Sequence, residues 1–351
     1  SNTHPTAITL TFKFNVWCHF HLALKHRNLN LHRMPYNKPW ISFSDQLQQL
    51  KDRGMLVEDD VAAENYLDRI GYYRLSGYWY PFRQIDSTDP KKRLDQFEDG
   101  THFTDALNLY VFDKKLRLLA MDALERIEVA IRVDIAHLLG ERDAFAYQDK
   151  SFLDGKFTKT KKGKSTSAYD DWLKKNTRLI NYSREPFIKN FKAKYGLPVP
   201  FWIAIEVWDF GAMSLFYAGM KRKDRDSIAQ KYKIPSGNTF ASWLRSLNYL
   251  RNLCAHHSLL WNRNMVDQPK LPDAADAGDL SNFIGQPKST ARPFILFCLL
   301  QWLMREICPN SCWHERFREH LKDFPAGAKQ LRSRSEMGCP AGWETWDLWK
   351  I

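Results

Sequence analysis

Three residues within six positions of the sequence carry side chains suited to acid–base chemistry on a phosphate: Arg251, Asn252 and His256. An imidazole exchanges protons near pH 7 and can act as general base or acid, an effect worth roughly 10² to 10⁴ in rate. A guanidinium offers a permanent charge and a fixed fork of donors to developing charge on phosphoryl oxygens. Together these groups could promote attack of a ribose 2′-OH on the adjacent phosphate, with no metal ion required.

A long amphipathic helix, predicted over residues 238–263, would position these groups. At about 100° per residue, an apolar stripe and a polar ridge lie on opposite sides of it. The stripe comprises Trp243, Leu247, Leu250, Cys254 and Trp261. The ridge comprises Arg245, Asn248, Asn252, His256 and Arg263. Because Asn252 and His256 stand four residues apart, they share a face, and Asn252 could hold the imidazole.

Arg251 lies about 120° from the polar ridge, so only its long side chain could bring its charge toward His256. His257 points nearer the apolar stripe. An Arg followed by a His after four to six residues is a weak pattern, since it recurs from Arg27 to His32 and from Arg132 to His137. The amphipathic helix favours catalysis at Arg251 to His256, against the alternative that the histidines are buried or cap a helix.

The charge balance points to a polyanionic partner. The 351 residues include 52 Lys and Arg against 40 Asp and Glu, a formal net charge of +12. Basic side chains placed on phosphates release condensed counterions, which favours nucleic acid as the partner class. A soluble protein that is merely basic is the alternative. No apolar run reaches the roughly 20 residues of a spanning helix, so no membrane partner is expected.

The six cysteines lack the regular spacing of a disulfide framework, and no secretory signal precedes them. We therefore expect a protein of the reducing cytoplasm. Cys308, Cys312 and His314 come nearest to a metal site, but this cluster lacks a fourth ligand nearby in sequence. We expect no metal and no other cofactor.

Apolar residues recur at helical spacing and strand patterns are almost absent, so an all-α fold is expected. Ser42 is a predicted cap of a helix that ends at Arg53-Gly54. Helices are further predicted at about 59–70, 104–138, 169–179, 184–194, 201–219, 222–232, 290–306 and 313–323.

The helix predicted from Thr104 has an apolar stripe and a wetter side, to which we assign Arg117, Glu125, Glu128 and Arg132. Glu128 and Arg132 are four residues apart and can pair on one face.

Two segments offer RNA contacts beside simpler explanations. Residues 71–83 are dense in aromatic side chains around Arg74 and could stack bases, although packing between two helical layers is favoured. Residues 155–167 form a predicted mobile, lysine-rich loop that would either grip phosphates or remain merely solvated. Its lysines are Lys156, Lys159, Lys161, Lys162 and Lys164.

We divide the chain into four parts. Residues 1–33 are an N-terminal extension or a tag and upstream region, and residues 34–100 an N-terminal helical region. Residues 101–310 are the helical core, which contains the loop at 155–167. Residues 311–351 hold a C-terminal helix and a Trp-rich tail that is expected to dock its tryptophans on the body.

The stretch 251–263 resembles the signature segment of the abortive-infection AbiD/AbiF-like family. Four more segments resemble the family in the same order, and the similarity covers roughly residues 34–310. These segments are 36–40, 71–79, 116–132 and 201–211.

This family is similar to HEPN ribonucleases and to the nuclease halves of type VI CRISPR effectors, and its members are bacterial phage-defence factors. The resemblance implies a HEPN-like helical bundle with additional N-terminal helices and an aromatic-rich connector. Its R-N-x3-H element falls on Arg251, Asn252 and His256, and its E-x3-K/R element on Glu128 and Arg132, which would lie beside the site with His257. Some members bind a small structured non-coding RNA.

The resemblance to HEPN proteins also implies a composite site, in which two helices that each carry an R-x4-6-H element face each other. We therefore expect a C2 homodimer in which each protomer contributes Arg251 and His256. Arg74, Arg245, Arg263 and the loop lysines are expected to contact RNA.

Three functions fit these observations. The first is a metal-independent endoribonuclease that leaves a cyclic phosphate and is held silent by a partner RNA or by autoinhibition. The second is an RNA-binding module without catalysis. The third, a nucleotide-modifying toxin, is weakened because the chain lacks a G-S-x10-D-x-D pattern.

Overall fold

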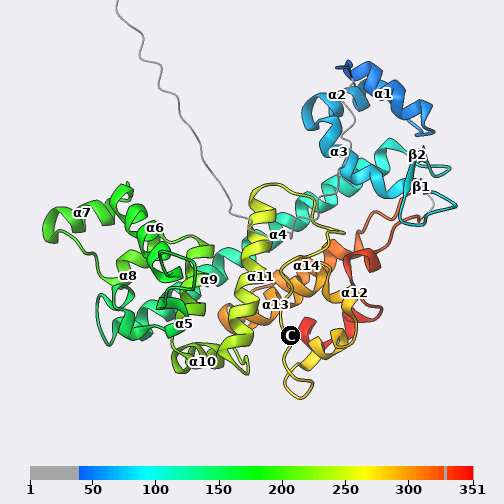
Figure 1. Ribbon diagram of the computed structural model, residues 1–351. Helices are drawn as coiled ribbons and strands as arrows, with labels where there is room; N and C mark the ends of the chain where they lie inside the picture. The colour runs from blue at the N-terminus through cyan, green and yellow to red at the C-terminus, as the bar shows by residue number, and fades with distance from the viewer. Residues whose placement is uncertain (1–38, 328–329, 351) are drawn as a thin grey trace, which may run out of the picture. The chain divides into compact units, whose positions relative to one another are not determined.

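Helices make up most of the computed structural model, which describes residues 39–327 and 330–350 (Figure 1). The expected all-α fold is confirmed. The strands in these ranges are β1 (Arg83–Ile85) and β2 (Arg93–Phe97), which pair antiparallel in a small hairpin. From Ser42 onward the chain forms one compact unit. The predicted extension at 1–33, with its Arg27 to His32 match, lies outside the described residues.

Three short helices open the fold: α1 (Phe43–Asp52), α2 (Asp60–Ile70) and α3 (Tyr72–Trp79). Ser42 forms a capping box with Asp45, as its sequence position predicts, and Asp59 caps α2. The aromatic segment is thus a helix rather than a connector. Leu75, Tyr78 and Trp79 are buried, which agrees with the packing interpretation of these rings.

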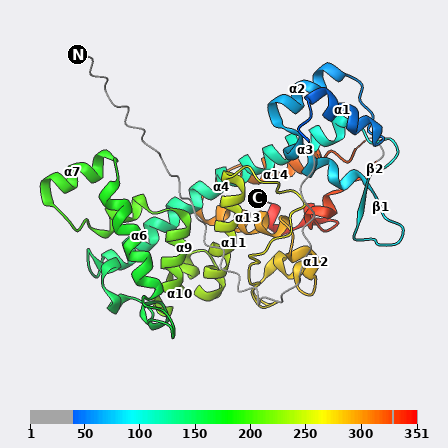
Figure 2. The same cartoon turned by 45° about the horizontal axis from the view of Figure 1, so that its top comes forward.

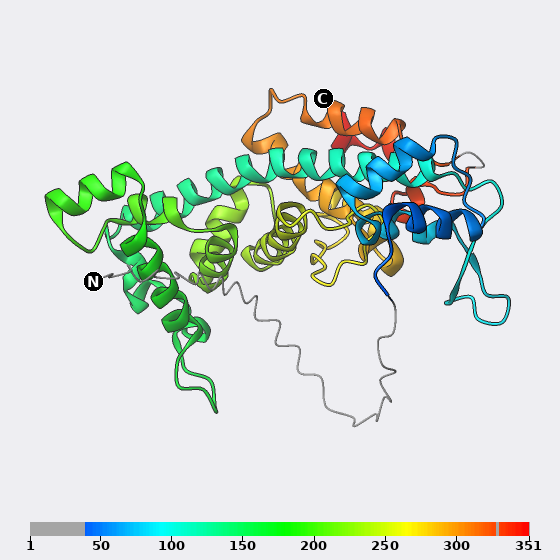
Figure 3. The ribbon, with the colours of Figure 1, turned by 90° about the horizontal axis from the view of Figure 1, so that it is seen from above.

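The longest element is α4 (Phe103–Gly140), a single helix of 38 residues. Figure 3 shows it running beside many of the others, and it contacts α3 and six helices described below: α8, α9, α10, α11, α13 and α14. One assignment on its surface was wrong. Arg117 is 5 % exposed rather than on the wetter side, because it pairs with a buried carboxylate.

The middle of the chain forms shorter helices. These are α5 (Gly155–Thr158), α6 (Ala168–Tyr182), α7 (Pro186–Tyr195), α8 (Phe201–Ala204), α9 (Phe210–Gly219) and α10 (Arg222–Lys231), with 3-10 turns at 146–148, 150–152 and 205–207. The single helix predicted over 201–219 was wrong. It is interrupted at Trp208, because the Asp209 side chain accepts from the Ala212 amide and starts α9 anew.

The lysine-rich segment 155–167 is partly helical and partly buried, although its sequence indicates a loop. It begins with α5, and Phe157 is buried against Gly219, where an added Cβ would come within 2.2 Å of the phenyl ring. The prediction of a loop over 155–167 was therefore wrong at its start. Its five lysines are exposed.

The helix carrying the candidate residues, α11 (Gly237–Ala255), is shorter than predicted. His257 adopts a left-handed conformation with φ 55°, and the amides of His257 and Ser258 bond the carbonyls of Cys254 and Leu253. This Schellman motif ends the helix. Trp261 and Arg263 therefore do not belong to its stripe and ridge.

The C-terminal part packs around α13 (Phe294–Ile307) and α14 (Trp313–Lys322), preceded by α12 (Pro287–Thr290) and followed by 3-10 turns at 334–337, 343–345 and 347–349. The helix predicted to start at residue 290 begins only at Phe294. Trp343 and Trp349 are buried, and Trp349 stacks on Phe317 with ring centroids 5.0 Å apart. The expected docking of the tail is confirmed. No helix in the described ranges is both long and apolar enough to cross a membrane.

His320 on α14 gives the fold a predicted dependence on pH. Its ring stacks on Phe112 of α4 at 4.2 Å, and its buried Nε2 has no hydrogen-bond partner. Burial lowers the pKa of His320 from 6.5 to about 4, so the folded state favours the neutral ring. The stabilisation of the folded state by the neutral ring is fully present above pH 6.5. It is lost as the pH falls toward 4, because the unfolded chain then binds the proton, and the loss is at most about 3 kcal/mol.

Urea unfolding at several pH values should show this loss in the wild type and a smaller one in His320→Phe. His137→Gln, a change at an exposed histidine of α4, should keep the wild-type slope. Equal slopes in all three proteins would contradict the assignment.

Candidate active site

His256 stands at the C-terminal end of α11, where its side chain is exposed to solvent. Its amide donates to the Asn252 carbonyl at 3.0 Å, so its backbone still follows the helix. His257 is exposed too, but its left-handed backbone serves to turn the chain out of the helix. His256 is therefore the imidazole that α11 itself presents.

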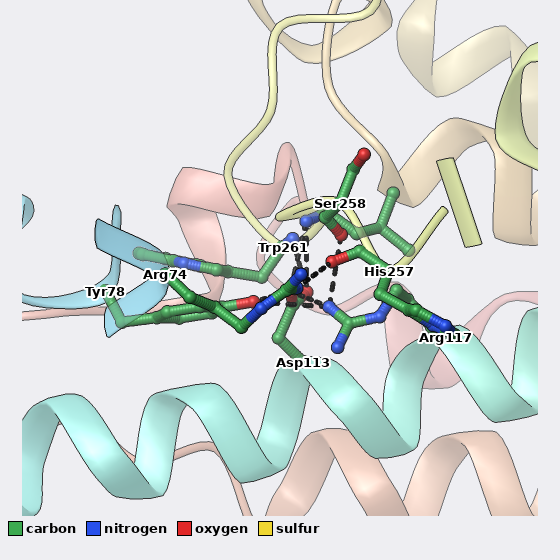
Figure 4. A network of polar contacts seen from close by, with 8 residues as sticks. Arg74, Tyr78, Asp113, Arg117, His257, Ser258 and Trp261 are labelled. Carbon is green, nitrogen blue, oxygen red and sulfur yellow. Dashed lines mark hydrogen bonds and ion pairs between the residues drawn. The ribbon is translucent and has the colours of Figure 1, made fainter. Parts of the chain in front are cut away.

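A buried carboxylate fixes the chain that leaves α11. Asp113 on α4 has no exposed side-chain surface and accepts from the Tyr78 hydroxyl at 2.7 Å. It also accepts from the backbone amides of Leu260 at 3.1 Å and Trp261 at 2.7 Å, and it pairs with Arg117 (Figure 4). We call Asp113 and these donors the Asp113 clamp.

Two guanidinium groups hold carbonyls of the same segment. Arg117 donates to the Ser258 carbonyl at 3.1 Å, and Arg74 of α3 donates to the His257 carbonyl at 2.7 Å (Figure 4). The carbonyls of the first two residues after the C-cap of α11 are thus bound by side chains from α3 and α4. Arg74, which we expected to contact RNA, has a contact that instead fixes the backbone next to His256.

Burial raises the pKa of the Asp113 carboxyl, while Arg117, the Tyr78 hydroxyl and the two amides act against that shift. Burial and the neighbouring Asp113 also raise the pKa of Tyr78, which keeps its hydroxyl a donor. A buried charge is tolerated when every lone pair has a partner, and the clamp meets that condition with four donors.

The sequence analysis missed Asp113 altogether. The available signal was an Asp and an Arg four residues apart among the apolar positions of the long helix. Charged residues are seldom fully buried unless paired, so such a pair indicates an internal ion pair.

A second group of charges surrounds Arg251. It joins Glu128 and Arg132 of α4, Asp209 at the start of α9 and Lys175 of α6, and we call these five residues the charge cluster. Glu128 pairs with Arg132, which also donates to the Trp208 carbonyl, and Lys175 pairs with Asp209 at 2.7 Å. Glu128 and Asp209 also interact electrostatically with Arg251.

The pKa shifts of the two carboxylates report the same neighbourhood. Burial raises the pKa of Glu128, although Arg132 and Arg251 oppose the shift. Burial also acts to raise the pKa of Asp209, but Lys175, the Ala212 amide and Arg251 outweigh it and hold that pKa below its ordinary value. The charges of Glu128 and Asp209 are therefore near enough to Arg251 for its guanidinium to act against a raised pKa at both carboxyls.

Arg251 and His256 leave α11 in different directions, about 140° apart for five residues of helix. Arg251 faces α4 and α9, and its guanidinium donates to the Asn252 side chain at 3.4 Å. Asn252 thus stands between the two catalytic candidates, but one copy of α11 does not aim both at the same point.

The other predicted RNA contacts are dispersed. Arg245 is exposed and pairs with Asp267 at 3.2 Å, and Arg263 donates to the Tyr249 hydroxyl at 3.2 Å from the loop after α11. Within the described part of the chain, no three His, Cys, Asp or Glu side chains form a group that could hold a metal ion. Cys308, Cys312 and His314 thus gain no support as a zinc site.

Comparison with known proteins gives one family. A family model described as Abi-like protein matches residues 65–262, more than half of the chain. The matched range includes the Asp113 clamp, the charge cluster and His256. Searches of curated proteins and of solved structures gave no match.

Asp113→Asn should strongly destabilise the protein. The change leaves the Arg117 charge buried without its counter-ion, which typically costs about 3–5 kcal/mol. Unfolding by urea measures this loss, and hydrogen exchange should show faster exchange at the amides of Leu260 and Trp261.

Asp122→Asn is the matched control on the same helix. Asp122 pairs with Arg126 at 2.8 Å and with Arg316 but is 28 % exposed, so its loss should cost about 1 kcal/mol or less. Similar costs for the two variants would refute the special position of Asp113.

Proposed function

Because the chain belongs to the Abi-like protein family, a family of abortive-infection proteins, we propose that it is an antiphage defence protein acting as a metal-independent endoribonuclease of the HEPN type. The observation that carries this proposal is the end of α11. There an exposed imidazole precedes a segment whose carbonyls are held by Arg74 and Arg117, and the guanidinium five residues earlier acts electrostatically on two carboxyls.

In the proposed reaction, His256 removes the proton of a ribose 2′-OH and the 2′ oxygen attacks the adjacent phosphorus. The bond from phosphorus to the 5′ oxygen breaks, and that oxygen takes a proton from a second imidazole. The products are a 2′,3′-cyclic phosphate and a 5′-OH. Arg251 binds the phosphoryl oxygens as their charge grows, which its donor fork suits.

The second imidazole would be His256 of the partner subunit in a C2 dimer. Three exposed apolar side chains support a contact surface near the charge cluster: Val129, Val133 and Trp202, which are 50 %, 56 % and 52 % exposed. A cavity of about 460 Å³ lies between Val133 and Trp202. Val129 and Val133 each follow a member of the cluster, Glu128 or Arg132, by one residue.

RNA would be both the substrate and, as a small structured non-coding RNA, the partner that keeps the enzyme silent. The net charge of +12 supports this assignment. The second candidate is a non-catalytic RNA-binding module of a defence ribonucleoprotein. The divergent directions of Arg251 and His256 within one protomer favour that alternative.

His256→Ala and Arg251→Ala should each slow RNA cleavage by roughly 10² or more, since each removes a group that acts in the transition state. The measurement is cleavage of labelled RNA in EDTA, with the product ends tested for cyclic phosphate. His257→Gly is the matched control, because glycine accepts the left-handed conformation and should leave both fold and cleavage intact. RNA binding without His256-dependent cleavage would favour the binding module.

Val133→Glu should convert the dimer to a monomer and reduce cleavage by roughly 10² or more, since each site would lose its second imidazole. Sedimentation velocity gives the mass of each variant. Val61→Glu places the same charge on α2, where Val61 is 73 % exposed, and should change neither property. A monomeric wild type with full activity would exclude the composite site.

A further inference from the structure

The net charge of the chain is concentrated in one segment. Residues 155–195 contain twelve Lys and Arg but three Asp and Glu, which accounts for most of the overall +12. The lysines before α6 were already expected to contact RNA. The basic residues of α6, of α7 and of the link between them were not, and they include Lys174, Arg178, Arg184, Lys189 and Lys194, all exposed.

Aromatic side chains lie exposed among these charges. Tyr182 is 77 % exposed and Tyr195 64 % exposed, although most aromatic side chains of the described residues are buried. The Arg178 guanidinium lies 5.8 Å from the centre of the Tyr182 ring, and the Lys194 ammonium lies 5.0 Å from that of Tyr195. Rings beside cations suit bases stacked above a phosphate backbone.

This surface rests on a firm support. The Trp172 indole of α6 donates to the Ala212 carbonyl of α9 at 2.9 Å, and Ile180 and Ile188 are buried. Lys192 of α7 donates to the carbonyls of Ile180 and Asn181 at 3.1 and 3.0 Å, which joins the two helices. Figure 2 shows α6 and α7 next to each other.

A stripe on α6 connects this surface to the charge cluster. Lys175, Arg178 and Tyr182 follow the spacing i, i+3 and i+7, so they lie within about 60° of one another around the helix. Lys175 belongs to the charge cluster through Asp209, whose pKa also responds to Arg251. The stripe therefore starts beside the candidate active site and continues toward the exposed tyrosines.

We propose that α6 and α7 form a binding surface for single-stranded RNA, along which the strand extends from the active site. This inference rests on the proposed ribonuclease function. Unpaired bases can stack on Tyr182 and Tyr195, whereas a duplex keeps its base faces covered and would use the lysines and arginines alone. The exposed rings thus favour a single strand.

The test uses the full chain with His256→Ala to prevent cleavage, and a fluorescent single-stranded RNA of mixed sequence. Tyr182→Ser should weaken binding roughly tenfold through lost stacking, with an unchanged dependence on salt. Arg178→Gln with Arg184→Gln should lower the slope of log affinity against log salt by about 1.4, or about 0.7 for each phosphate contact. The matched controls on α2, Tyr66→Ser and Arg69→Gln, should bind as the parent does.

Binding that is unchanged in the α6 variants would overturn the inference. So would an equal loss of affinity for a duplex of the same sequence in Tyr182→Ser, because it would indicate a general polyanion surface. With His256 intact, the α6 variants should raise KM for long RNA but cleave a dinucleotide at the wild-type rate. Absence of any His256-dependent cleavage, with tyrosine-dependent binding retained, would refute the nuclease and leave the RNA surface in place.

Discussion

The carboxylate of Asp113 is the interaction on which the rest of this structure depends. Asp113 is a residue of the longest helix, and its side chain is fully buried. An unpaired charge at a buried position costs several kcal/mol, so the fold requires all of the donors to this carboxylate. Those donors come from α3, from the next turn of α4 and from the backbone beyond α11. One buried charge thus determines how three parts of the sequence are joined.

This constraint bears directly on the candidate chemistry. The segment held by the clamp starts at Ser258, two residues after His256, and His257 between them adopts the left-handed conformation. The imidazole therefore projects from a fixed backbone while its ring remains free to meet a substrate. Arg251 has a different environment: its guanidinium donates to the Asn252 side chain, and its charge acts on the carboxyls of Glu128 and Asp209.

Much of the fold could be predicted from local patterns. Ser42 and Asp59 have the side chains of N-caps, and the apolar spacing of α4 marks its full length. The end of α11 could not be predicted this way, because the left-handed residue that ends the helix is His257 and not the Gly or Asn that usually marks such an end. The break before α9 was missed because Asp209 was treated as an interior residue and not as a cap.

The site was predictable only in part, for a related reason. Arg251, Asn252 and His256 stand out by residue type, and Glu128, which the family resemblance placed beside the site, interacts electrostatically with Arg251. Little in the sequence indicated Asp113, because three of its four partners lie far from it in the sequence: Tyr78, Leu260 and Trp261. The exposure of Tyr182 and Tyr195 could not be predicted either, since a sequence does not show which aromatic side chains remain outside the core.

The bond from the Trp261 amide to Asp113 spans 148 positions of the sequence. A nascent chain that has emerged only as far as α10 already contains Asp113 and Arg117. It still lacks the amides of Leu260 and Trp261 that donate to the Asp113 carboxylate. Closing so long a loop is costly in entropy, and the contacts that repay it come last. The end of α11, with His256, therefore cannot complete its contacts with Asp113 until the chain has been synthesised through Trp261.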